Sequence, residues 1–390
     1  MADSDNRSDD RIIAESIWGP CKSSQEKHLA RFLDHCALQR LSLCIDQPRT
    51  GDSTNEIAGA IRLLRSKPAV RKDEILSRMS PNLSRLAYLD CAVRTMLMTE
   101  CESEGTAAIG SGNVLRWAES ETLTDYLSRI YPQSTSMDVP KDLIDFKNLR
   151  CHILARDAGI KIQQTEKLSD HLYLRHSPGS KILLVFSHRA FLEHSQERLS
   201  VIRQDLSHST DEALSLGCLP AKLIDETLRS YNLLFPPIGN AKSRKLLREW
   251  VKRERLDESL LNPSFDHSKK DPPRTLHDLY EDFPYWAPQL ARLLEEVDDP
   301  TPTTRWERYA ERRKSHRHTY KCAVAALVVA AVSGTLATLL AAVQVWISYC
   351  DWDKNTNKTL CLLESAVVSW RERERDRERE RHSILFVLGT

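Results

Sequence analysis

The residues best suited to acid–base chemistry in this sequence are the adjacent Asp170 and His171. A carboxylate and an imidazole are common partners in general acid–base catalysis. Neighbouring residues on a strand, however, point to opposite faces, so these two side chains would not hydrogen-bond to each other. We therefore favour a structural role, with a buried His171 or with Asp170 capping the turn before a hairpin. Asp170 and His171 therefore remain weak candidates for an acid–base pair.

Other catalytic and cofactor-binding patterns are incomplete. Residues 105–112 resemble the first half of a phosphate-binding loop, but the lysine after the second glycine is missing and no strand precedes the loop. His188 and His194 are six residues apart, which fits neither a pair on one helix face nor a zincin motif. The ten cysteines include no CxxC, which excludes a zinc ribbon. We predict no catalytic residue, no cofactor and no metal site.

Two positions are candidates for covalent modification. Of the three sequons, at Asn6, Asn82 and Asn357, only Asn357 falls on the side of the membrane that we assign to the lumen, where glycosylation occurs. Its closeness to the membrane disfavours its use. Cys322 lies at the predicted membrane boundary, a position open to palmitoylation. The alternative for Cys322 is an unmodified small apolar side chain.

One segment is long and apolar enough to cross a bilayer. Residues 323–347 contain no charge, and a helix of that length spans roughly 37 Å, more than the ~30 Å hydrocarbon core. Aromatic residues flank the segment, with Tyr320 at one end and Trp346 and Tyr349 at the other. A buried core helix is the alternative, but such helices seldom run so far without a polar face. We predict a single transmembrane helix over 322–348.

The charges beside this helix predict its orientation. The preceding residues 301–321 carry a net charge of +5 and are predicted to form a basic juxtamembrane helix. The chain begins with an acidic, polar segment and no signal peptide. The positive-inside rule therefore places the N-terminal part in the cytosol and the tail, 349–390, across the membrane. That tail includes an Arg/Glu repeat at 371–381, for which a flexible tail or a simple-repeat expansion is the expected explanation.

Small residues recur every four positions along the predicted span. This spacing allows two helix backbones to approach closely, although alanine-rich spans also produce it by chance. It makes a homodimer through the span a candidate interaction. The stripe consists of Ala326, Ala330, Gly334, Thr338 and Ala342.

Composition favours a mainly helical protein. The chain has 390 residues with only 12 glycines, and its net charge of +1 argues against nucleic-acid binding. Helix-period patterns are clear in two places: His28, Leu29, Phe32, Leu33 and Cys36 follow one face, and residues 220–234 begin at a proline and end before Pro236. The segment 159–163 reads as a short strand, and the segments around Pro178-Gly179 as a hairpin over 172–186.

These patterns give an expected domain organisation. The cytosolic part divides into a disordered N-terminus, a helical region, and a second helical region that contains the hairpin. Their expected bounds are 1–10, 11–140 and 141–300.

Several spaced signatures resemble a family of uncharacterised single-span membrane proteins of filamentous fungi. They include the Leu-Ser-Asp-His-Leu run at 168–172, the Leu-Leu-Phe-Pro run at 233–236, and Trp306 followed by Arg312-Arg313 just before the span. The resemblance covers about residues 114–353. It implies a mostly helical cytosolic region and a C-terminal span, with no established activity. The family's usual member ends soon after the span, whereas this chain continues to residue 390.

The sequence leaves two functions open. The first is a membrane-anchored, non-enzymatic interaction or scaffold protein, with the lipid bilayer and an unknown protein as partners. The second is an enzyme or accessory factor of a fungal biosynthetic pathway with an unrecognised site. A polar cluster lining a pocket near Asp170, His171 and His188 would favour the enzyme.

Overall fold

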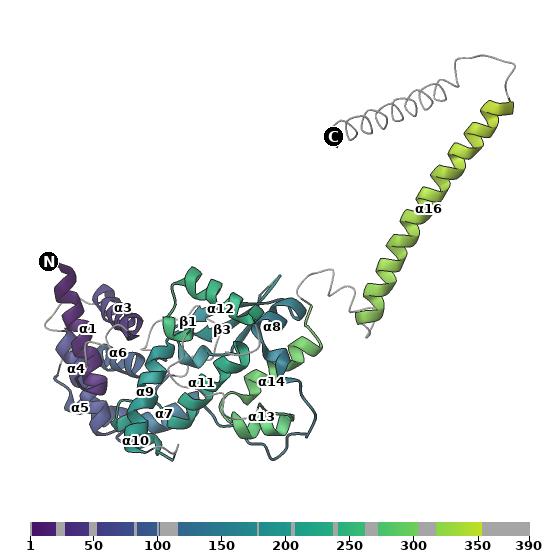
Figure 1. Cartoon of the computed structure of the whole chain (residues 1–390). Coiled ribbons are helices and arrows are strands. Elements are labelled where there is room, and N and C mark those ends of the chain that lie inside the picture. Colours follow the sequence, from purple (N-terminus) through teal and green to yellow (C-terminus); the bar gives the residue numbers. More distant parts are fainter. Residues whose placement is uncertain are drawn as a thin grey trace, which may run out of the picture. The chain divides into compact units, whose positions relative to one another are not determined.

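The computed structural model describes residues 2–20, 28–46, 53–81, 84–99, 101, 116–177, 179–203, 207–236, 241–261, 272–302 and 317–352. Contacts divide the chain into two compact units, Met1–Arg305 and Trp306–Thr390. The expected fold class is confirmed: the chain is mainly helical, with a small sheet and a C-terminal apolar helix (Figure 1).

A three-stranded sheet lies within the larger unit, in the order β1–β3–β2. Strand β2 (Leu174–Ser177) pairs antiparallel with β3 (Ser180–Phe186), so the predicted hairpin is confirmed. Gly179 lies in its turn with a φ of +82°, a left-handed conformation that favours glycine. Strand β1 (Ile160–Thr165) pairs in parallel with β3, a neighbour relation that the sequence did not reveal.

The central strand β3 is buried along most of its length. Leu183, Val185 and Phe186 are fully buried and Leu184 nearly so, which is the pattern of a strand covered on both faces. Backbone groups just past the strand are also paired, since the Ser187 N–H donates to the Thr165 carbonyl at 3.0 Å. The sheet is therefore a rigid frame at the point where β1 and β3 end.

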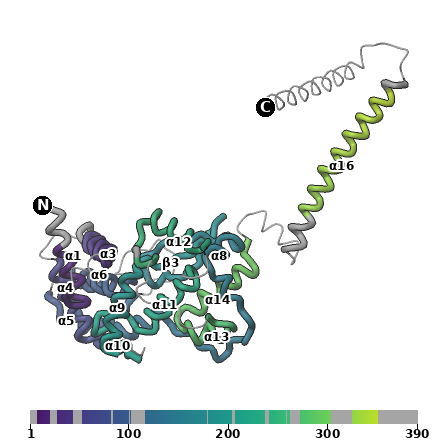
Figure 2. Tube along the Cα trace, viewed as in Figure 1, coloured from purple at the N-terminus to yellow at the C-terminus, as the bar shows by residue number. Residues whose placement is uncertain are grey.

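Helices surround this sheet. Figures 1 and 2 show the described helices of residues 2–97 gathered at one end of the larger unit. These are α1 (Ala2–Trp18), α3 (Ala30–Asp46), α4 (Ser53–Ser66), α5 (Lys72–Arg78) and α6 (Arg85–Leu97). The later helices are α7 (Leu123–Ile130), α8 (Cys151–Asp157), α9 (Arg189–Ile202), α10 (Thr210–Ser215), α11 (Ala221–Leu234), α12 (Ala241–Glu254), α13 (Leu276–Asp282) and α14 (Ala287–Asp298). Short 3₁₀ turns are η1 (Phe146–Leu149), η2 (Leu168–Asp170) and η3 (Glu258–Leu260).

One hydrophobic core runs through the larger unit. Trp18 and Phe32 from the first helices belong to the same cluster as Phe186 of β3 and Trp286 beside α14. The boundary expected at residue 140 therefore falls inside one compact unit.

The N-terminal segment differs from the expectation of disorder over 1–10. Helix α1 begins at Ala2, and the carboxylates of Asp9 and Asp10 lie 2.9 and 3.1 Å from the Arg40 guanidinium of α3. Ile17 is fully buried and Ile13 nearly so. The first turns of α1 are too polar for the sequence to predict a helix there. Tertiary packing of its apolar face stabilises the helix.

The second unit contains helix α16 (Arg317–Trp352). Its apolar stretch, Val324–Tyr349, has 26 residues, and no part of its most apolar window is buried by protein. The hydroxyls of Ser333, Thr335 and Thr338 donate to carbonyls of their own helix, which satisfies them without a partner. Residues 303–316 of the basic segment and 353–390, which include Asn357, lie outside the described residues, as do Asn82 and the side chain of Cys322.

A buried ion pair joins the sheet to the last helix of the larger unit. The Lys181 ammonium of β3 lies 2.5 Å from a carboxylate oxygen of Glu296 in α14, and both side chains are about 95% buried. Thr301 donates to the same carboxylate from its backbone N–H at 2.7 Å and from its hydroxyl at 2.9 Å. Burial raises the pKa of Glu296, but the bonds from Lys181 and Thr301 outweigh it and lower the pKa overall.

Replacing Lys181 by Met should destabilise the larger unit by about 3 kcal/mol, because it leaves the Glu296 charge buried without its cation. The measurement is urea unfolding of the full chain in detergent, followed by tryptophan fluorescence. The matched control is Lys245→Met, which breaks an exposed ion pair with Glu249 and should change the free energy of unfolding by less than about 0.5 kcal/mol. Equal effects of the two variants would contradict this role of the buried pair.

Candidate functional site

The structure places Asp170 and His171 in a turn rather than on a strand. Asp170 ends the 3₁₀ turn η2, and the fully buried His171 follows it. The His171 Nδ1 accepts the Phe186 N–H at 3.2 Å, so Nε2 carries the proton and donates to the Ser230 hydroxyl at 2.8 Å. Ser230 in turn donates to the Thr227 carbonyl at 2.6 Å. Both ring nitrogens of His171 are thus engaged in holding β3 against α11.

This environment keeps His171 neutral. Burial lowers its pKa to about 3, because the charged form loses its hydration. A neutral imidazole with both nitrogens bonded to protein has no free atom for proton transfer to a substrate. The structural interpretation of His171 is the one that its contacts support.

A different cluster forms where the two parallel strands end. Parallel strands carry their carboxyl ends to the same edge of a sheet, and Thr165 of β1 pairs with Phe186 of β3. The residues that follow, Glu166 and His188, therefore lie close together. Helix α3 contributes His35 to the same place.

The three side chains converge on a small volume. One ligand atom from each of His35, Glu166 and His188 lies within 4.8 Å of the other two. The His35 Nδ1 is 3.1 Å from Glu166 Oε2, and the His35 and His188 rings meet edge to face with centroids 5.4 Å apart. His35 and His188 are only 5% and 1% exposed, whereas the Glu166 side chain is 42% exposed. The cluster is thus closed on the protein side and open at Glu166.

Three ring nitrogens of the cluster have no hydrogen-bond partner among the described residues. They are Nε2 of His35 and both nitrogens of His188. Burial, reinforced by the charges of His35 and Arg31, lowers the pKa of His188 to about 3. The hydrogen bond from His35 lowers the pKa of Glu166, although burial acts in the opposite direction. The cluster therefore brings the neutral His188 ring and a second imidazole beside an ionised carboxylate, and imidazole nitrogens with a carboxylate oxygen are a donor set for a divalent metal ion.

A second group of metal-binding side chain types has an ordinary structural role. His277, Asp278 and Glu281 lie together on α13. Asp278 accepts the Thr275 N–H at 3.0 Å and completes a capping box at the start of that helix. These side chains are intermediate or exposed, and their geometry is explained by the cap.

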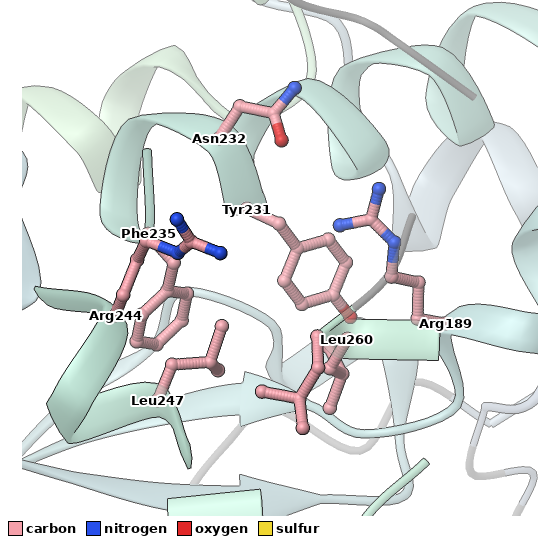
Figure 3. Close-up of a pocket in the computed structure, with 8 residues that line it drawn as sticks. Arg189, Tyr231, Asn232, Phe235, Arg244, Leu247 and Leu260 are labelled. Carbon is pink, nitrogen blue, oxygen red and sulfur yellow. The ribbon is translucent and has the colours of Figure 1, made fainter. Parts of the chain in front are cut away.

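A small cavity lies beside Arg189, the residue that follows His188. Figure 3 shows the Arg189 guanidinium beside the Tyr231 ring, 5.3 Å from its centroid. The cavity has a volume of about 50 Å³ and is also lined by Phe235, Arg244 and Leu247. Ligand pockets for organic molecules are typically about 300–1,000 Å³, so this space suits a few waters rather than a substrate.

Comparison of the chain with protein-family models, with curated proteins and with solved structures finds no match. The class is therefore defined by the structure itself: a mainly helical protein with a small sheet, a polar cluster at the sheet's edge, and one helix long enough to span a membrane.

Glu226 of α11 is a buried carboxyl group outside both clusters. It is 3% exposed and accepts the Tyr285 N–H at 2.8 Å. Burial raises its pKa to about 8 despite hydrogen bonds from Tyr285 and Trp286. Since this pKa lies above the ordinary value of 4.5, the folded state holds the proton more tightly than the unfolded state.

The stability of the protein should therefore fall between about pH 4.5 and pH 8, because the stabilising proton is fully present below the unfolded pKa and is lost as pH rises through the folded pKa. Glu226→Gln should raise the free energy of unfolding at pH 8 by about 1–3 kcal/mol and change it little at pH 4.5. Urea unfolding across this range measures the effect. The exposed Glu249→Gln serves as control, and a pH-independent effect of Glu226→Gln would contradict the assignment.

Proposed function

We propose that this protein is a single-pass integral membrane protein whose larger unit faces the cytosol and acts as a non-enzymatic interaction or scaffold module. The observation that carries the proposal is the helix Val324–Tyr349, whose most apolar window is not buried by any described part of the chain. Large exposed apolar surfaces on soluble proteins are rare, and a bilayer is the environment that covers such a helix on all sides.

Charge and thiol chemistry support the cytosolic orientation. The net charge of +5 over residues 301–321 lies on the N-terminal side of the span. The larger unit contains five buried cysteines that form no disulfide: Cys36, Cys91, Cys101, Cys151 and Cys218. Free thiols are typical of proteins in a reducing compartment.

An interaction role is favoured over catalysis by the interior of the larger unit. His171, one of the two acid–base candidates, is committed to structural hydrogen bonds, and the cavity at Arg189 is too small for an ordinary organic substrate. The cluster at His35, Glu166 and His188 is the observation that favours the second candidate, an enzyme or accessory factor of a biosynthetic pathway.

Two narrower statements belong to the same proposal. The spaced signatures over 114–353 support membership of the fungal single-span family, which has the same order of a helical unit followed by a span. The small-residue stripe of the span supports a homodimer, because its side chains are uncovered on α16 and its only hydroxyl, on Thr338, is already bonded within the helix.

In microsomes, the full chain should resist extraction with alkaline carbonate, because an uncharged helix of this length is not displaced from lipid at high pH. Added protease should digest the N-terminal unit and spare a fragment containing the span. A sequon introduced near Glu364 should be glycosylated, whereas Asn82 should not. N-linked glycosylation is detected as a shift in electrophoretic mobility that glycosidase treatment removes.

The matched control for insertion is the double variant Val332→Arg and Leu339→Arg, which places two charges at the centre of the span at a cost of about 2.5–3.5 kcal/mol each. This variant should be released by carbonate. Release of the unaltered chain would refute the span, and glycan on Asn82 would reverse the orientation.

Affinity purification of the tagged full chain from solubilised membranes should recover a stoichiometric protein partner if the larger unit is an interaction module. The partner should also be recovered with the chain carrying Glu166→Gln, because a docking surface does not need the polar cluster. Recovery of the chain alone, or as a homodimer only, would contradict the scaffold proposal and leave the enzyme as the favoured function.

A further inference from the structure

We propose that His35, Glu166 and His188 form a binding site for a divalent transition-metal ion, with Zn²⁺ as the ion that the donor set suits best. Two imidazole nitrogens and one carboxylate oxygen are a recurrent set of three protein ligands for zinc. The inference concerns the larger unit alone and does not depend on the membrane topology or the scaffold role proposed above.

The spacing of the donors fits a single ion. Ligands about 2.0–2.1 Å from a metal in tetrahedral geometry stand roughly 3.3–3.4 Å apart. The His35 Nδ1 and Glu166 Oε2 are 3.1 Å apart, and all three ligand atoms lie within 4.8 Å of one another. The 4.8 Å bound exceeds the tetrahedral spacing by about 1.4 Å, so the side chains would turn toward one centre when the ion binds.

The unpartnered nitrogens point to a ligand at this place. His188 is 1% exposed, yet neither of its ring nitrogens has a hydrogen-bond partner among the described residues. Buried polar groups in folded proteins are normally satisfied. A metal ion takes one lone pair from each ring, and a buried water is the alternative that the experiment must separate from it.

The charges around the cluster decide whether a cation is acceptable. Glu166 supplies one negative charge, with its Oε2 3.1 Å from the His35 Nδ1. Arg31 is the opposing charge, held by hydrogen bonds to the Gln164 side chain and, at 2.8 Å, to the Arg255 carbonyl. One carboxylate and one guanidinium therefore act on the cluster, and the carboxylate is the group in contact with a ligand ring.

The elements that carry the ligands show what the ion would do. His35 and Glu166 are 131 residues apart, so one ion would join helix α3 to the edge of the sheet. Three protein ligands leave a fourth position for water, and Glu166, the exposed member, lies on the solvent side. The site therefore combines a structural tie with an open coordination position.

The test uses the full chain, purified in detergent without a polyhistidine tag and stripped with a chelator. After incubation with Zn²⁺ and desalting, metal analysis should give one zinc per chain, and added Zn²⁺ should raise the unfolding temperature. Glu166→Gln and His188→Gln should each weaken zinc binding by more than about 100-fold, since changes outside the first ligand shell alone cost about 10–100-fold. Co²⁺ in place of Zn²⁺ should give the visible absorption of a low-coordinate site.

The matched controls are Glu281→Gln and His277→Gln, which alter the other group of His and carboxylate side chains and should leave zinc binding unchanged. If His188→Gln fails to fold, Glu166→Gln decides, because its side chain is 42% exposed and its loss leaves the core intact. No retained zinc and no thermal shift would indicate a water-filled cluster and overturn the proposal. Zinc lost only with the α13 variants, or retained in full by Glu166→Gln, would overturn it as well.

Discussion

Six residues of β1 pair in parallel with six of β3, from Ile160 with Lys181 to Thr165 with Phe186, and the arrangement of the polar interior depends on this register. Because both strands end at the same edge, the residues that follow them are forced together. Glu166 and His188 become neighbours although 22 residues separate them. A register shifted by one residue would turn β1's side chains to the opposite face and separate the pair.

The same strand end organises the helices that cover it. The Phe186 N–H donates to His171, and its carbonyl accepts the Tyr231 hydroxyl of α11. His188 precedes the first turn of α9. A strand buried on both faces has no water to satisfy its terminal backbone groups, so side chains must do so. His171 and Tyr231 meet that requirement, which explains why two titratable residues are buried here.

Local patterns predicted much of the fold. The hairpin followed from two apolar runs around Pro178-Gly179, and helix α11 (Ala221–Leu234) lies within the segment predicted for it, because its apolar period and its flanking prolines agree. The parallel pairing of β1 could not be predicted, since β2 lies between β1 and β3 in sequence and no local signal ranks the two possible neighbours. The helix at residues 2–10 was missed because tertiary contacts, such as those to Arg40, stabilise a polar turn.

The sequence did not reveal the polar cluster either, because tertiary contacts bring its members together. His188 was recognised as a histidine of interest, but its partners come from two other elements. His35 stands three residues after Phe32, close to the helix face that the sequence did reveal, and Glu166 follows the predicted strand 159–163. Both signals exist, yet only the three-dimensional pairing shows that they belong together. The site is thus a property of the topology, whereas the candidate span is a property of composition and was evident from the sequence.

The contact of Thr301 with Glu296 has a mechanical consequence. Thr301 is among the last described residues of the larger unit, and its backbone N–H and hydroxyl both donate to Glu296. The other partners of Glu296 are Lys181 of the central strand and His176 of β2. Tension applied along the chain beyond residue 302 would pass through these bonds into α14 and β3 before it reached any peripheral helix. This end of the larger unit is therefore tied directly to the central strand, so a pull applied there would load the sheet instead of peeling away a terminal helix.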